Sequence, residues 1–169
     1  MRIVLISIKP KYVKSIISGK KTVELRRRIP KIKKGDLVFI YSTSPVKAIQ
    51  AYSFVDKIVS KEPEELWNEV ESISGVSKKE FDNYYKGKFI GYGIYLKDIE
   101  PIIKPISLDD LREKFEISNP PQSFRYLSKS QFVKTTDYIV PLQLSFKFYK
   151  QDFIRRGLDK IVKNYQLQY

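Results

Sequence analysis

The residues best suited to chemistry lie together near the amino terminus, where residues 18–28 read Ser-Gly-Lys-Lys-Thr-Val-Glu-Leu-Arg-Arg-Arg. The stretch carries five basic side chains and a single carboxylate, Glu24. Because neighbouring cations lower the pKa of a lysine, Lys20 and Arg26 favour Lys21 as an activator of a nucleophile or a stabiliser of an oxyanion. Glu24 is suited to act as a general acid or base, so Lys21 and Glu24 are the candidate catalytic residues if the protein is an enzyme.

Alternation predicts a strand over residues 22–28 that sorts these side chains onto two sides. One side carries Thr22, Glu24, Arg26 and Arg28, and the other carries Val23, Leu25 and Arg27. A carboxylate between a hydroxyl and a guanidinium can orient a ligand or transfer a proton. The same pattern is typical of a solvated strand face with a cross-strand ion pair, and the alternation leaves both interpretations open.

The chain has neither cysteine nor histidine. Thiolate chemistry is therefore excluded, and the commonest general base and metal ligand at neutral pH are missing. We predict no metal site and no cofactor, and acid–base chemistry that uses carboxylates, lysines, tyrosines or hydroxyls.

The formal net charge of +13 is concentrated at the amino-terminal end. Residues 1–35 contain twelve Lys or Arg and one acid, whereas residues 36–169 contain twenty bases and eighteen acids. Such a concentration attracts polyanions, so the predicted partner is nucleic acid, RNA above all, or a nucleotide-like ligand. An acidic protein or a membrane surface is the second choice, and the remaining alternative is that the lysines only solvate a helix and a loop.

The length of 169 residues fits one main core, and the longest apolar runs are far below the roughly 18 residues of a membrane span. The apolar stretch 1–8 is too short for a signal peptide and is followed by lysines. We expect a cytoplasmic protein and no membrane association.

Periodicity and turn residues predict the elements that position these side chains. Strands are expected at 2–8, 22–28, 36–41, 46–55, 89–99 and 102–106, helices at 10–18, 63–72, 77–87, 107–115 and 152–165, a turn at 42–45, an extended loop at 119–127 and a β-prone segment at 137–148. Ser77 and Glu80 form a predicted capping box. This order differs from the alternating pattern of a parallel α/β sheet and favours a small curved sheet or barrel with helices at its side.

Several short motifs resemble the ASCH domain family. They are Ser-Ile-Lys-Pro-Lys-Tyr at 7–12, Ile-Ser-Gly-Lys-Lys-Thr-Val-Glu-Leu-Arg-Arg at 17–27, Lys-Gly-Asp-Leu-Val at 34–38, Tyr-Ser-Thr-Ser-Pro-Val-Lys-Ala-Ile at 41–49 and Tyr-Lys-Gly at 85–87. The resemblance implies an α+β fold, with a PUA-like mixed or antiparallel β-barrel and flanking helices as a domain over residues 1–110. Residues 111–169 are then a C-terminal helical extension that packs on the same domain.

The family resemblance also implies a cleft lined by the Gly-Lys-Lys-Thr segment. Family members are proposed to bind RNA or to regulate transcription, a ribonuclease is known among them, and a bacterial branch hydrolyses N4-acetylcytidine with a lysine, a threonine and a glutamate. By motif position Lys21 matches that lysine, but Glu24 stands where the threonine would be. The branch's glutamate falls near Ser74, with Glu69 and Glu71 close by.

The leading hypothesis is a nucleic-acid-binding module, with a role in transcription or RNA metabolism. The predicted ligand-binding residues are Lys20, Lys21, Thr22, Glu24, Arg26, Arg28, Tyr41, Ser42, Thr43, Ser44, Lys47, Ser123, Phe124 and Arg125. The basic groups would bind phosphate, the hydroxyls would add donors, and the aromatic rings, with Tyr126, would stack on unpaired bases. The alternative is a hydrolase of modified nucleosides or RNA that uses Lys21 and Glu24, and a third reading makes the C-terminal helix a protein-interaction surface.

Overall fold

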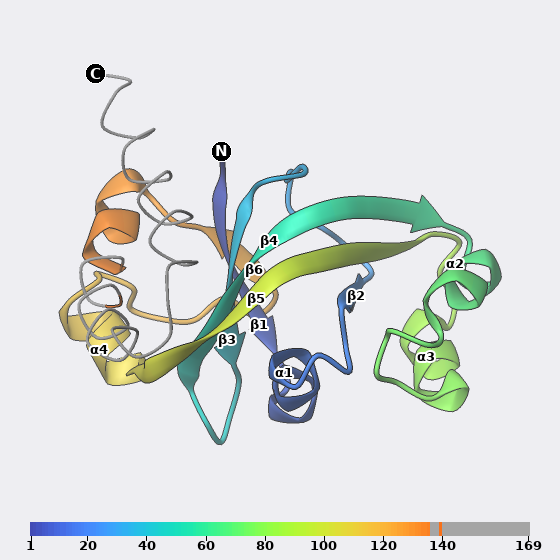
Figure 1. Ribbon diagram of the computed structural model, residues 1–169, viewed down its shortest axis with the longest axis horizontal. Helices are drawn as coiled ribbons and strands as arrows, with labels where there is room; N and C mark the ends of the chain where they lie inside the picture. Colours follow the sequence, from blue (N-terminus) through green and yellow to red (C-terminus); the bar gives the residue numbers. More distant parts are fainter. Residues whose placement is uncertain (136–138, 140–169) are drawn as a thin grey trace.

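The computed structural model of this 169-residue chain describes residues 1–135 and 139. Its elements are β1 (Ile3–Ile8), α1 (Pro10–Ile17), β2 (Val23–Arg26), β3 (Leu37–Ser42), β4 (Ala48–Lys61), α2 (Pro63–Val70), α3 (Lys78–Tyr85), β5 (Gly91–Ser107), α4 (Leu108–Glu113) and β6 (Phe124–Tyr126). The strands form one mixed sheet in the order β2-β5-β4-β3-β1-β6, in which the β1–β3 pair is parallel. The sheet curves into a half-barrel, with α2 and α3 at one end of the long β4–β5 pair and α4 at the other (Figure 1).

The inner strands are apolar on both faces because each face has its own core. Alternate residues of β1 divide between the two: Ile3 and Leu5 enter one cluster, and Val4 and Ile6 enter the other. β3 divides in the same way, with Phe39 on one face and Ile40 on the other. The strand expected at 2–8 is therefore present as β1 and is covered on both faces.

α1 starts at Pro10, which has no backbone N–H to leave unpaired in the first helical turn. Val13 and Ile16 are buried, but Ile17, which follows Val13 at i+4 spacing, is 37% exposed. The helix ends at Ile17, so the chain leaves the core before a further turn can cover this side chain. In α3 the predicted capping box is confirmed: the Ser77 hydroxyl accepts from the Glu80 backbone N–H, and the Glu80 carboxylate accepts from the Ser77 N–H.

Three strand predictions need correction. β2 ends at Arg26 and not at residue 28, β4 continues to Lys61, and the two strands predicted at 89–99 and 102–106 are the single strand β5. Pro101 pairs with Ala51 and does not interrupt the strand. β5 stays continuous because it pairs with β4 on both sides of this point. Instead of a break, the pairing has register irregularities in β4.

A third core joins β2 to α2 and α3. Val23 and Leu25 pack in this cluster with Leu66 and Phe81, so the predicted inward side of the strand is confirmed. Gly91 permits the close approach, since a Cβ there would lie 2.7 Å from the Leu66 side chain and 2.8 Å from the Tyr85 ring. The packing holds α3 beside β2, where it forms one wall of the site described below.

The segment predicted as an extended loop at 119–127 contains β6, which pairs antiparallel with β1. Beyond residue 110, Leu111, Phe115 and Phe132 are buried in the same cluster as Ile3. The domain boundary at residue 110 stays a prediction, and the predictions for 137–148, apart from residue 139, and for 152–165 lie outside the described residues.

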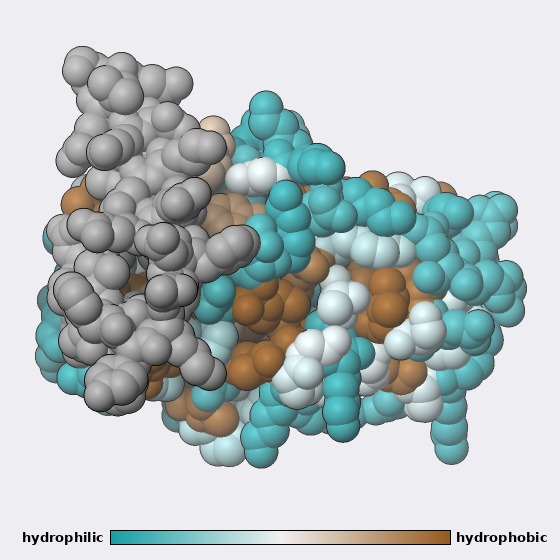
Figure 2. All heavy atoms as spheres, viewed as in Figure 1, coloured by the Kyte–Doolittle hydropathy of each residue, from teal (hydrophilic) through white to brown (hydrophobic). Residues whose placement is uncertain are grey.

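On the face shown in Figure 2, hydrophilic side chains follow the rims and apolar patches lie between them. Within the described part of the chain, no helix combines the length and the apolar character needed to cross a membrane.

Candidate functional site

A cleft of about 720 Å³ opens between α1, the β2 strand, α3 and the segment that precedes β6. Charged side chains lie on its floor and tyrosines on its walls. The residues used below that line it are Ser7, Lys11, Tyr12, Lys21, Glu24, Arg26, Arg27, Thr43, Glu80, Tyr84 and Ser123.

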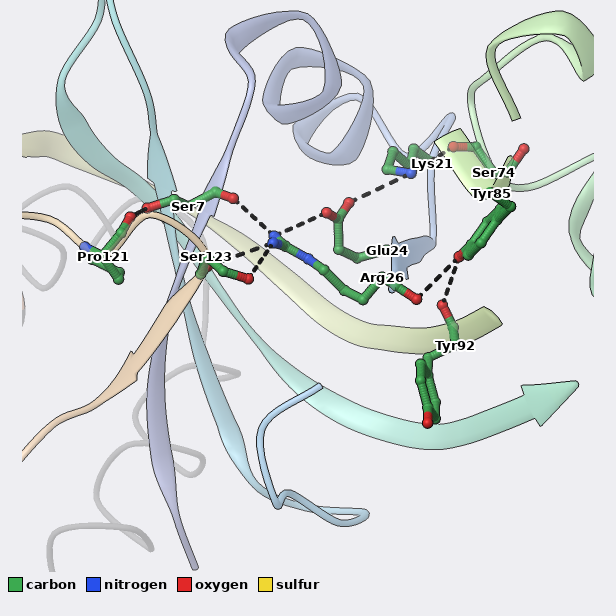
Figure 3. A network of polar contacts seen from close by, with 9 residues as sticks. All are labelled: Ser7, Lys21, Glu24, Arg26, Ser74, Tyr85, Tyr92, Pro121 and Ser123. Atoms are coloured by element: carbon green, nitrogen blue, oxygen red, sulfur yellow. Dashed lines mark hydrogen bonds and ion pairs between the residues drawn. The ribbon is translucent and has the colours of Figure 1, made fainter. Parts of the chain in front are cut away.

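The floor of the cleft is a buried ion cluster, by which we mean Lys21, Glu24 and Arg26 (Figure 3). These side chains are almost fully enclosed, with relative exposures of 1%, 7% and 8% in that order. The Glu24 carboxylate lies between the cations, with Oε1 3.0 Å from Arg26 Nη2 and Oε2 3.5 Å from Lys21 Nζ. The interpretation of this strand face as solvated is therefore wrong, because α1, α3 and the segment before β6 cover it.

Arg26 is held by groups from two distant segments. Its Nη2 donates to the Ser7 carbonyl of β1 at 2.8 Å, and its Nη1 donates to the Ser123 hydroxyl at 3.3 Å. The Ser7 hydroxyl in turn donates to the Pro121 carbonyl at 2.5 Å, and the Tyr85 hydroxyl donates to the carbonyl of Arg26 itself at 3.2 Å. Arg26 therefore ties β2 to β1 and to the chain that enters β6 (Figure 3).

Lys21 lies against the backbone that joins α2 to α3. Its Nζ donates to the Ser74 carbonyl at 2.7 Å and lies 5.4 Å from the centroid of the Tyr12 ring. Burial lowers the pKa of Lys21 below 10.5; the Glu24 carboxylate opposes this shift, and the Arg26 charge adds to it. A larger fraction of Lys21 is therefore neutral near pH 7 than of an exposed lysine, and a neutral amine is a competent general base.

The buried ion cluster has an uncompensated positive charge. Two cations face one carboxylate, and their remaining partners in the described structure are neutral carbonyls and a hydroxyl. Such a site attracts an anionic group, because a second negative charge completes the neutralisation of the buried cations.

The walls of the cleft carry aromatic rings and further charges. Lys11 lies 4.6 Å from the centroid of the Tyr12 ring and forms an ion pair with Glu80. The hydrogen bond from Lys11 is the largest cause of a pKa of about 2 for Glu80, with smaller contributions from Ser77. On α3, the Tyr84 ring carries the Arg27 guanidinium 4.9 Å from its centroid.

The structure brings six of the predicted site residues to the cleft or beside it. Lys21, Glu24 and Arg26 converge on its floor, while Thr43 and Ser123 lie in its lining. Arg28 lines a second hollow that adjoins the cleft. Their roles toward a ligand stay predictions.

The other predicted site residues lie outside the cleft lining. Three of them, Lys20, Ser44 and Lys47, are exposed, and Thr22 and Arg125 are half-buried. Tyr41 is buried in the core cluster of Ile3, and Phe124 packs on the core cluster of Val4. Ser42 is a buried polar residue. Tyr41 and Ser42 are not among the residues that line the cleft, because β3 continues through Ser42 and pleating directs these two side chains to opposite faces of the sheet. Tyr126, expected to stack, accepts a hydrogen bond from the Lys31 backbone N–H.

Sequence reasoning missed Ser7, Tyr12, Tyr84 and Arg27 in the cleft. Ser7 had a signal, since it is the one hydroxyl in an otherwise apolar strand. Arg27 was assigned to the core side, but the strand ends one residue earlier and releases its side chain.

The region of Ser74 does reach the site, through its backbone carbonyl. Of the nearby carboxylates, Glu69 pairs with Lys57 and Lys61 instead, and Glu71 is exposed. Among the described residues there is no group of three or more Asp or Glu side chains placed to hold a metal ion.

Comparison with known proteins agrees with this architecture. A family model described as the ASCH domain matches residues 6–116. An ASCH domain-containing ribonuclease from Zymomonas mobilis is 36% identical over 129 residues, which are 76% of this chain and 86% of that protein.

Among solved structures, the crystal structure of ASCH from Zymomonas mobilis matches with a TM-score of 0.76 and 35% identity, over 80% of this chain and 94% of that one. The N-terminal domain of Staphylothermus marinus McrB shares the fold, with a TM-score of 0.56, 10% identity and coverage of 80% and 93%. The predicted PUA-like α+β fold is therefore confirmed, with a half-barrel as the form of its sheet. This chain belongs to the ASCH domain family.

Proposed function

We propose that this protein binds single-stranded RNA in the cleft and cleaves its phosphodiester backbone. The observation that carries the proposal is the buried ion cluster, in which a lysine of lowered pKa lies beside a carboxylate and an anchored arginine. The similarity to a protein named as an ASCH domain-containing ribonuclease supports the same function.

Two features support RNA as the ligand. A phosphodiester carries one negative charge, which matches the surplus positive charge that the cluster has when Lys21 is protonated. The Tyr12 and Tyr84 rings in the walls offer surfaces on which a base can stack, and such stacking requires a base that is free of a duplex. Lys11 and Arg27 lie beside these rings and add positive charge along the path of the backbone.

The cluster is suited to cleavage that uses the ribose 2′-hydroxyl as the nucleophile. Neutral Lys21 accepts the proton of the 2′-hydroxyl, and the 2′-oxygen forms a bond to phosphorus as the bond from phosphorus to the 5′-oxygen breaks. The 5′-oxygen takes a proton from solvent, which gives a 2′,3′-cyclic phosphate and a 5′-hydroxyl end. Arg26 stabilises the charge that develops on the phosphorane oxygens, and Glu24 keeps the Arg26 guanidinium and the Lys21 amine in place.

The test uses 5′-labelled RNA of twelve nucleotides, its duplex, the DNA of the same sequence and N4-acetylcytidine. We expect cleavage of the single-stranded RNA alone, to products that end in a cyclic phosphate. Lys21→Met should lower kcat by about 100-fold or more, the usual contribution of a general base. The matched control is Lys20→Met, because Lys20 is the adjacent lysine and is exposed outside the cleft.

The pH profile supplies a separate readout. Because the neutral form of Lys21 is the base and its pKa lies below 10.5, kcat should rise with pH until that pKa is passed. Turnover of N4-acetylcytidine would favour the amidohydrolase alternative. Salt-sensitive RNA binding without any product would favour the hypothesis of a nucleic-acid-binding module. An unchanged kcat in Lys21→Met would refute the role of that lysine as the general base.

A further inference from the structure

A second hollow of about 390 Å³ adjoins the cleft. Its lining consists of Arg26, Arg27, Arg28, Tyr84, Lys88 and Ser123. Four of these, Arg26, Arg27, Tyr84 and Ser123, also line the cleft, so the two spaces lie side by side. The volume falls within the range of about 300–1,000 Å³ that is typical of sites for small ligands.

The lining of this second hollow is basic without a carboxylate. The cleft pairs its cations with Glu24 and Glu80, but the second hollow has three arginines and one lysine and no acid. In the part of the chain that the structure describes, Arg28 and Lys88 form no ion pair, and Arg28 is exposed. These two cations are therefore available to an anionic group from solution.

Tyr84 stands at the boundary between the two spaces. The Arg27 guanidinium carbon, Cζ, lies over the Tyr84 ring, 4.9 Å from its centroid. The centroids of the Tyr84 and Tyr85 rings are also 4.9 Å apart, with an angle of 78° between the ring planes. The Tyr85 hydroxyl is hydrogen-bonded to the carbonyls of Arg26 and Tyr92, which fixes the ring that supports Tyr84. A planar guanidinium on a supported ring presents a flat cationic surface on which a base can stack.

We propose that this second hollow is a subsite for the nucleotide next to the one held in the cleft. A phosphate there is bound by Arg28 and Lys88, and the adjoining base stacks on the Arg27–Tyr84 pair. The inference rests on the proposed RNA function of the cleft and deepens it, because it makes the ligand an extended strand and not a mononucleotide or nucleoside. The strand crosses Arg26 as it passes from one space to the other.

The size of the effect follows from counterion release. A contact to one phosphate of a single strand changes the slope of log K against log salt by about 0.7. At 0.1 M salt this corresponds to about 0.7 log unit of affinity relative to 1 M, so the loss of the one phosphate contact that Arg28 and Lys88 share weakens binding by about 5-fold. A ligand too short to enter the second hollow loses nothing.

The experiment measures binding and not cleavage, so that it stays informative if the protein does not cleave RNA. The ligands are a decamer and a nucleoside 3′-monophosphate, both 2′-O-methylated to remove the nucleophile, and their binding is measured by fluorescence anisotropy and by competition. The proteins are the wild type, Arg28→Ala/Lys88→Ala, and Lys79→Ala as a control that removes an exposed lysine of α3 outside both spaces.

We expect the wild type to bind the decamer more tightly than the mononucleotide. In Arg28→Ala/Lys88→Ala, affinity for the decamer should fall about 5-fold at 0.1 M salt, and the salt slope should become shallower by about 0.7, with affinity for the mononucleotide and the melting temperature unchanged. Equal loss for both ligands, or equal loss in Lys79→Ala, overturns the subsite. Cleavage of the unmodified RNA is scored in parallel, and its absence refutes the ribonuclease proposal while the subsite is judged by binding alone.

Discussion

Replacing Glu24 with glutamine preserves the shape of the side chain and removes its charge from between two buried cations. In the wild type the carboxylate lies 3.0 Å from Arg26 Nη2 and 3.5 Å from Lys21 Nζ, and it has 7% relative exposure. Without it, both cations keep only neutral partners among the described residues, namely the carbonyls of Ser7 and Ser74 and the hydroxyl of Ser123. We therefore expect Glu24→Gln to destabilise the fold strongly.

The distances set the magnitude. At an effective dielectric constant of about 20, each of the two contacts represents a gross attraction of about 5 kcal/mol. Part of this is offset by desolvation of the charges, and the usual cost of removing one member of a buried ion pair is about 3–5 kcal/mol. We expect the free energy of unfolding of Glu24→Gln to fall by that amount at pH 7.

Removing Lys21 should destabilise the fold less than removing the Glu24 charge, because the two substitutions leave different net charges in the cluster. Lys21→Met leaves the Glu24–Arg26 pair intact and electrically balanced, so its main cost is the unpaired Ser74 carbonyl, about 1–2 kcal/mol. The double variant Lys21→Met/Glu24→Gln buries one surplus cation in place of two. It should be more stable than Glu24→Gln alone, since removing Lys21 relieves part of the damage.

The loss of stability in Glu24→Gln should also depend on pH. Glu24 raises the pKa of Lys21 against the lowering effect of burial, so its removal lowers that pKa further below 10.5. Between the folded pKa and 10.5 the unfolded chain binds the proton more strongly, and stability therefore increases with pH across this window. The deficit of Glu24→Gln is largest below the folded pKa and shrinks toward pH 10.5.

Urea denaturation of the four proteins, followed by circular dichroism between pH 6 and pH 10, measures all of these quantities. The reasoning is refuted if Glu24→Gln lies within 1 kcal/mol of the wild type at pH 7, or if Lys21→Met is equally damaging. It is also refuted if the double variant is less stable than Glu24→Gln, because the surplus charge would then not be the cause.

Two further predictions concern the segments that hold the cleft walls. Gly75 has φ +65°, and a Cβ there would lie 3.0 Å from Lys21 Cβ. Gly75→Ala should therefore lower the free energy of unfolding by about 1–2 kcal/mol in urea denaturation, and it should reduce RNA cleavage by more than the unfolded fraction explains. A loss of stability alone would contradict a role of Gly75 in positioning Lys21. Ser77→Ala should lower stability by about 1 kcal/mol through loss of the cap on α3, whereas Lys79→Ala on the same helix should be neutral, and equal effects of the two would argue against the cap.

The sequence predicted the parts of the site that depend on neighbouring residues. Alternation brought Glu24 and Arg26 to one side of β2 and Leu25 to the other, because pleating is a property of the local backbone. It did not predict that the polar side is buried. That depends on Ser74 and Ser123, which lie 53 residues from Lys21 and 97 residues from Arg26 in the chain.

The errors in the strands have a related origin. Pro101 and the charged residues near it predict a break in an isolated strand, but β4 pairs with β5 on both sides of this point. The sequence predicts a strand that ends at Tyr41 and a turn that begins at Ser42, yet the parallel pairing of β1 with β3 extends the strand through Ser42. In each case a partner strand that is distant in sequence overrides the local preference.

The composition of the buried ion cluster argues that it is retained for binding and not for stability. A buried cation lowers the stability of the fold. An apolar side chain at position 21, or a second carboxylate beside the two cations, would remove the surplus charge. Instead, the chain satisfies Lys21 and Arg26 with neutral backbone carbonyls, which position the two cations without cancelling their charge. Sites that break a rule of stability in this way are expected where function requires it. An anion of single charge is the group that such a site lacks, and the phosphodiester of a nucleic acid strand is an anion of that kind.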